Sequence, residues 1–207
     1  ADGLLGKVGD LQTHNMYAYC ANNPVMYLDP SGEFFILSTI LITTAIGGLL
    51  GFGFTFANEL ISNDFDLNKI DWKEIWGNTI TGAAIGAAYG LGAGAGAIIK
   101  GTATLFSLTT TQSFVVLAST AGLLNFSAGA LSYHIRHKGR EGYEIGQMIS
   151  SAFGQMGKGY TVFGAGTLFG VTGLWKPTDF GNMTARVLGK QIITFAPVYL
   201  FDNLYKY

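Results

Sequence analysis

The sequence predicts a mainly α-helical protein, in which several apolar, glycine-rich helices follow a short N-terminal piece rich in β-strand and turn residues. Charged residues make up 12% of the 207 residues, about half of the usual ~25%. Glycine contributes 30 residues, roughly twice its average share. The mean hydropathy of +0.34 and the long uncharged stretches favour a chain that is associated with a membrane or covered by a partner.

The N-terminal piece ends in two turns around a short extended run. Residues 22–24 (Asn-Asn-Pro) and 29–32 (Asp-Pro-Ser-Gly) combine proline with side chains that form turns, and the second turn adds a glycine free to take positive φ. Val25 and the alternating tyrosines around it suit half-buried strands. We therefore expect a small β- and turn-rich unit over residues 1–32.

The pattern Asn-x-Tyr-x-Tyr-Cys-x-Asn-Asn-Pro-Val-x-Tyr-x-Asp-Pro-Ser-Gly over residues 15–32 resembles the end of the RHS (YD-repeat) associated core of bacterial polymorphic toxins. Residues 1–3 resemble the segment just upstream. In that family the repeats build a hollow β-shell, and the variable segment after Asp-Pro-x-Gly is the toxin carried inside. The resemblance implies that residues 33–207 are toxin cargo of a larger protein that is secreted or displayed on the cell surface. It also implies two partners, the upstream shell and an immunity protein.

In autoproteolytic members of this family, the cargo is released just after an Asp-Pro-x-Gly-Leu motif with the help of two aspartates. The matching positions are Asp2 and Asp29. Two carboxylates held together can differ in pKa and serve as acid and base. Glu33 stands where the family motif has leucine, and a carboxylate fits an apolar pocket poorly. We therefore expect weak or absent self-cleavage after residue 33, with Asp29 serving as a turn residue.

Residues 34–57 contain no charged side chain and exceed the ~20 apolar residues that a helix needs to cross a membrane. The four glycines of this stretch would weaken a helix in water but are common where membrane helices pack together. A spanning or inserting helix is therefore favoured over a buried helix of a soluble domain.

The polar break at residues 59–74 separates this stretch from the next. Asp71 followed by Glu74 is typical of a helix N-terminus. Trp72 and Trp76 then stand where the interfacial anchor of a membrane helix lies.

Residues 78–99 repeat glycine at every fourth position, which predicts a helix with one face that another helix can approach closely. Residues 160–175 contain a shorter version of the pattern. A flexible Gly/Ala linker over residues 91–97 is the alternative. The glycines that we assign to helix packing are Gly82, Gly86, Gly90, Gly94, Gly166 and Gly170.

The remaining helices are expected from their apolar runs and helical spacing. The last of them is interrupted by Pro197. They cover residues 112–133, 143–158, 160–175 and 183–200.

The only dense basic cluster, residues 134–141, follows the helix expected at 112–133. Beside an apolar run, such a cluster marks the side of a membrane on which basic loops stay, and it is attracted to anionic headgroups. The alternative is a nuclease with a histidine as base, an arginine on phosphate and a glutamate on a metal, although His-x-x-His alone does not specify a metal site. That alternative uses His134, His137, Arg136, Arg140, Glu141 and Glu144.

We expect a toxin that acts physically, by inserting helices into the membrane of a target cell to form a pore or to translocate. A net charge of −1 does not favour binding to nucleic acid, because the basic excess that neutralises phosphates is absent. Gly92-x-Gly94-x-x-Ala97 imitates a dinucleotide fingerprint but lacks the preceding strand and the acidic residue about 20 positions on. We therefore expect no cofactor and no metal.

Overall fold

The computed structural model describes residues 33–172 and residue 197. In this part of the chain four α-helices occur and no strand, which confirms the mainly α prediction for the described residues. The turn-rich unit expected over 1–32 and most of the helix expected at 183–200 lie outside them. The helices are α1 (Glu33–Ser62), α2 (Trp72–Ile99), α3 (Thr110–His137) and α4 (Ile145–Thr172), with a short 3-10 helix, η2 (Leu67–Lys69), before α2.

Two of the helices begin with side-chain caps. The carboxylate of Asp71 accepts a hydrogen bond from the backbone N–H of Lys73 (3.0 Å), so the helix start expected at Asp71 is confirmed. The hydroxyl of Thr109 accepts from the N–H of Gln112, and the Gln112 side chain accepts from the N–H of Thr109 (3.0 Å). Because these caps satisfy N–H groups that lack partners within the helix, α2 and α3 begin sharply at the positions observed.

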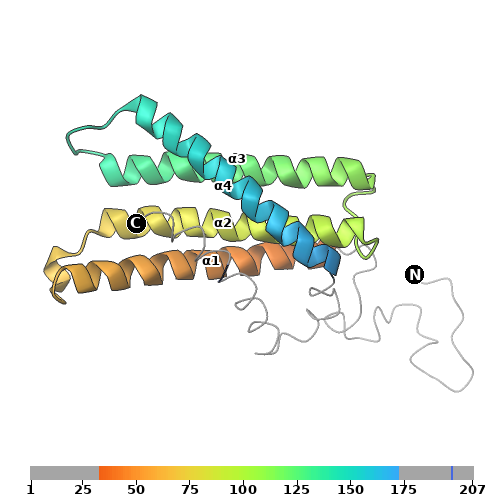
Figure 1. Ribbon diagram of the computed structural model, residues 1–207, viewed down its shortest axis with the longest axis horizontal. Coiled ribbons are helices and arrows are strands. Elements are labelled where there is room, and N and C mark those ends of the chain that lie inside the picture. Colours follow the sequence, from red (N-terminus) through yellow and green to blue (C-terminus); the bar gives the residue numbers. More distant parts are fainter. Residues whose placement is uncertain (1–32, 173–196, 198–207) are drawn as a thin grey trace, which may run out of the picture.

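One expectation about helix continuity is wrong. The helices expected at 143–158 and 160–175 form one helix, α4, that runs through Gly159 (Figure 1). A Cβ at Gly159 would overlap the side chain of Asn125 in α3, so close packing compensates for the ~1 kcal/mol that glycine costs a helix. The helix expected over residues 78–99 is present, and the alternative of a flexible linker over residues 91–97 is excluded, since this stretch is helical and buried.

Helix α2 lies at the centre of the bundle. It packs against α1, α3 and α4, and α3 also packs against α4. Helices α1, α2 and α3 lie along the long axis, with α2 antiparallel to both α1 and α3, while α4 crosses them obliquely (Figure 1). The buried core gathers around Tyr89 of α2, with Leu117 of α3 and Phe163 of α4 among its members. At ~1.5 Å per residue, each helix is about 42–45 Å long.

Candidate membrane-inserting surface

The first face of α2 is a row of glycines in direct contact with the backbone of α1. A Cβ on Gly82 would overlap the carbonyl oxygen of Gly47, and a Cβ on Gly86 would overlap that of Thr43. At Gly90 an added Cβ would lie 2.7 Å from the Cα of Ile40. The structure thus brings Gly82, Gly86 and Gly90 into one helix–helix interface. Gly94 continues the row, where a Cβ would lie 2.9 Å from Cγ2 of Ile36.

A second glycine face of α2 packs against α4. A Cβ on Gly166 would overlap the carbonyl oxygen of Tyr89, and at Gly170 it would lie 2.9 Å from the Cα of Gly96. Gly92 meets the backbone of Phe163 in the same way. The sequence-based assignment of Gly166 and Gly170 thus places them correctly in a helix interface, but it omitted Gly92 and Gly96.

The signal for the second face was present in the alternation of glycine with leucine or alanine from Gly90 to Gly96. Two residues along an α-helix turn it by about 200°. Gly90 and Gly94 therefore face one way, while Gly92 and Gly96 face nearly the opposite way. The stretch that resembles a flexible linker is thus a helix with glycine on two opposite faces, packed between α1 and α4.

A buried amide connects the three helices α2, α3 and α4. Asn125 of α3 is fully buried, and its Nδ2 donates to the carbonyl oxygen of Ala84 in α2 (3.1 Å). Gln155 of α4 donates to Oδ1 of Asn125 (3.5 Å). Hydrogen bonds of this kind between helices stabilise bundles in an apolar environment. The sequence analysis did not single out Asn125, although it is an isolated amide within an apolar stretch.

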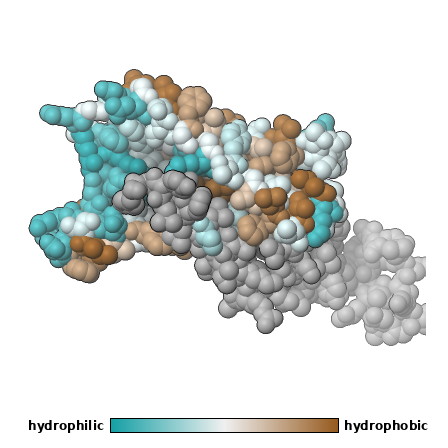
Figure 2. Space-filling model, viewed as in Figure 1, coloured by the Kyte–Doolittle hydropathy of each residue, from teal (hydrophilic) through white to brown (hydrophobic). Residues whose placement is uncertain are grey.

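The outer face of the bundle carries many large apolar side chains. Leu49 of α1 is 71% exposed and Leu123 of α3 is 66% exposed. Apolar residues lie over much of the described surface, whereas hydrophilic residues gather at the end that holds the α1–α2 and α3–α4 connections (Figure 2). The outward-facing set on α1 and α3 comprises Leu37, Leu41, Leu49, Phe54, Ile61, Phe114, Val115, Val116, Leu123, Leu124 and Leu131.

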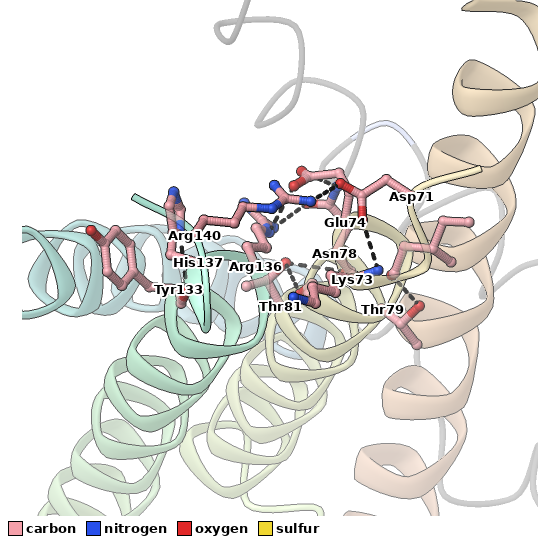
Figure 3. A network of polar contacts seen from close by, with 12 residues as sticks. Asp71, Lys73, Glu74, Asn78, Thr79, Thr81, Tyr133, Arg136, His137 and Arg140 are labelled. Carbon is pink, nitrogen blue, oxygen red and sulfur yellow. Dashed lines mark hydrogen bonds and ion pairs between the residues drawn. The ribbon is translucent and has the colours of Figure 1, made fainter. Parts of the chain in front are cut away.

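The basic cluster is engaged in contacts between helix ends (Figure 3). Arg136 at the end of α3 pairs with Glu74 of α2 (3.5 Å), and Arg140 pairs with Asp71. The ammonium group of Lys73 donates to the carbonyl oxygen of Lys138 (2.8 Å). Partial burial raises the pKa of Asp71, but the hydrogen bond and charge of Arg140, with the N–H groups of Lys73 and Glu74, outweigh it and hold that pKa below its ordinary value.

The two histidines of the nuclease alternative contact different tyrosines. Nδ1 of His134 lies 3.1 Å from the hydroxyl of Tyr143, whereas Nδ1 of His137 lies 3.0 Å from the carbonyl oxygen of Tyr133. Glu141 is exposed in the α3–α4 connection. Within residues 33–172, no group of three or more His, Cys, Asp or Glu side chains could hold a metal ion. Asp2 and Asp29 lie outside the described residues.

The two arginines of the nuclease alternative form ion pairs with carboxylates of α2 and its N-cap. Arg136 and Arg140 are paired with carboxylates, so phosphate would have to compete with Glu74 and Asp71. This arrangement gives the cluster a structural role in joining α2 to α3.

Comparisons with protein-family models, with curated proteins and with solved structures find no match for this chain.

Proposed function

We propose that residues 33–207 act as a membrane-inserting helical module. The observation that carries this proposal is the distribution of side-chain size: glycines make the closest contacts between the helices, while many leucine, isoleucine, valine and phenylalanine side chains are exposed. In water this distribution leaves large apolar side chains unburied. In a bilayer it matches apolar side chains to lipid and small residues to close helix contacts.

The lengths of the helices support the same proposal. Three helices are long and apolar enough to cross a membrane: α1 from Ile36, α2 and α3. Each is about 40 Å long, which exceeds the ~30 Å hydrocarbon core of a bilayer. The polar connections at residues 63–71 and 138–144 then extend beyond that core.

The biological setting of the proposal comes from the resemblance over residues 15–32. A segment that follows an RHS-type core is toxin cargo in that family, so the module would act on the membrane of a target cell, by forming a pore or by translocating. Its partners would be the upstream shell before release, an immunity protein in the producing cell, and the lipid bilayer at the target. The insertion itself is a physical process and needs no catalytic residue.

The test places a charge on the outer face. Leu49→Arg puts a guanidinium group on an exposed position near the middle of α1, which costs about 2.5–3.5 kcal/mol at the centre of a membrane helix. We expect the variant to bind liposomes at least about tenfold more weakly than the parent chain and to release at least about tenfold less of a trapped dye. A free-energy cost of about 1.4 kcal/mol already corresponds to a tenfold change in binding.

The matched control is Asn68→Arg, which adds the same charge in the exposed α1–α2 connection and should leave both measurements nearly unchanged. A Leu49→Arg chain that binds and permeabilises liposomes as well as the parent would overturn the proposal, because an exposed leucine of a soluble protein tolerates arginine. Ile85 is a poorer test position, since it is buried in the core and a charge there would unfold the bundle in any solvent.

A further inference from the structure

Two features gather at one end of the bundle and are not used by the proposed function. We call this region the charged end and define it as residues 59–74 and 134–144, which include the α1–α2 and α3–α4 connections. The opposite end contains the α2–α3 connection, residues 100–109. An aromatic cluster adjoins the charged end, which also holds most of the described basic side chains close to a helix connection.

The aromatic cluster lies where the apolar outer face meets the charged end. Phe52 of α1 contacts Trp76 of α2 edge-on, with ring centroids 6.4 Å apart, and Phe56 contacts Trp72 at 6.3 Å. Trp72 is 50% and Trp76 is 54% exposed. Tryptophan is enriched at the membrane–water interface because its ring is apolar while its indole N–H needs a polar partner.

The length of α2 places these tryptophans at that interface. Residues 78–99 span about 33 Å at ~1.5 Å per residue, which already covers the ~30 Å hydrocarbon core. The first turn and a half of α2, which carries Trp72 and Trp76, therefore extends into the headgroup region. The polar contacts of Arg136 with Glu74 and Asn78 lie at the same level.

The basic side chains differ sharply between the two ends. Within residues 33–172, the connection and helix ends at the opposite end carry Lys100 as their one basic side chain. Lysine and arginine near membrane helices stay on the cytoplasmic side, and carboxylates contribute little to this preference. The pairing of Arg136 and Arg140 with carboxylates therefore weakens attraction to anionic lipid but leaves the topological signal intact. The charged end carries Lys69, Lys73, Arg136, Lys138 and Arg140.

We propose that the charged end is an interfacial anchor on the cytoplasmic side of the membrane, and that the α2–α3 connection emerges on the opposite side. This inference rests on the proposed membrane function and adds the orientation. In this orientation Trp72 and Trp76 lie among the lipid headgroups and the basic side chains face the cytoplasm. The α2–α3 connection lies on the far side of the membrane and carries one basic side chain, Lys100.

The orientation is tested with single cysteines in the full 207-residue chain after Cys20→Ser has removed the natural thiol. Ser107→Cys places a thiol in the α2–α3 connection, and Glu141→Cys places one in the charged end; both positions are exposed. The variants are produced in a bacterial host, and spheroplasts are treated with a membrane-impermeant maleimide before or after lysis. We expect Ser107→Cys to react in intact spheroplasts and Glu141→Cys to react only after lysis.

The reverse labelling pattern, or labelling of both thiols from the outside, would overturn the orientation while the chain remains in the membrane fraction. A chain that alkaline carbonate extracts from the membranes, with both thiols labelled only after lysis, would overturn the proposed membrane function and this inference with it. The two failures are therefore distinguishable.

The position of the tryptophans is tested by fluorescence in liposomes, in a Trp175→Phe chain that retains only Trp72 and Trp76. We expect stronger quenching by lipids with bromine near the headgroup than by lipids with bromine near the end of the acyl chain. Stronger quenching by the deep bromine would overturn the interfacial anchor. No quenching by either lipid, with no binding to the liposomes, would overturn the membrane function itself.

Discussion

Helices α2 and α3 have the same length and a similarly apolar composition, yet α2 is buried at the centre of the bundle and α3 is largely exposed at its surface. In the apolar segment of α2, 83% of the residues are buried, whereas in that of α3 only 33% are. The difference lies in side-chain size, because α2 presents glycine on two faces while α3 carries Val115, Val116 and Leu123 outward. Hydropathy makes both helices candidates for a membrane, whereas small residues decide which helix the others pack around.

The largest effect should come from enlarging the inner face of α2. We expect Gly86→Ala to destabilise the bundle by about 1–3 kcal/mol, because the new methyl group meets the backbone of α1 at Thr43 and neither helix can move away cheaply. Removing three carbons from the outer face of α3 with Leu123→Ala should change stability by less than about 0.5 kcal/mol. Thermal unfolding in detergent micelles measures both. Equal losses in the two variants would contradict the contrast between the helices.

A second test concerns the polar contact that joins α3 to its neighbours. Asn125→Ala removes the hydrogen bond to Ala84 and leaves Gln155 without its partner, so we expect a loss of about 1–3 kcal/mol. Ser127→Ala is the control, because its hydroxyl is exposed and bonds only to Leu123 of the same helix. If both substitutions are equally harmless, Asn125 does not hold α2, α3 and α4 together.

A third test contrasts two glycines of α4. A Cβ at Gly154 meets nothing within 4 Å, so Gly154→Ala should stabilise the protein by up to about 1 kcal/mol through helix propensity alone. Gly170→Ala should have the opposite sign, since its Cβ would overlap the backbone of Ala93 in α2. Melting temperatures of the two variants check the signs, and stabilisation by Gly170→Ala would show that α4 does not pack against α2 as closely as described.

The smallest effect should come from the charged end. The lowered pKa of Asp71 means that its ion pair with Arg140 stabilises the folded state above about pH 4. This contribution decreases as the pH falls through the lowered pKa and the carboxylate takes up a proton. Both side chains are partly exposed, so we expect about 0.2–1 kcal/mol.

Asp71→Asn, which can still cap α2, should lower stability at pH 7 and should cost less stability at pH 2. Unfolding measured at both pH values tests this. A variant whose loss is as large at pH 2 as at pH 7 would show that Asp71 acts through its cap geometry and not through its charge.

Local signals were sufficient to locate most of the helices. The uncharged runs, the Asp71 N-cap and the glycine repeat at 82–94 each depend on residues a few positions apart, so they can be read along the chain. The same reasoning placed a break near Gly159 and left a flexible linker over 91–97 as the alternative to a helix, because glycine favours both when only its propensity is considered. Contacts with Asn125 and with the backbone of α4 reverse that preference.

The sequence by itself determined that this protein is apolar, sparsely charged and mainly helical, and that glycine would mediate close helix contacts, since composition and 3.6-residue periodicity are properties of the chain alone. Only the tertiary structure decided that α2 is central, that it has two glycine faces and that large apolar side chains point outward. It also decided that Arg140 pairs with Asp71, which lies 69 positions away in the sequence. Contacts over such distances arise from the packing of whole helices, and no local pattern encodes them.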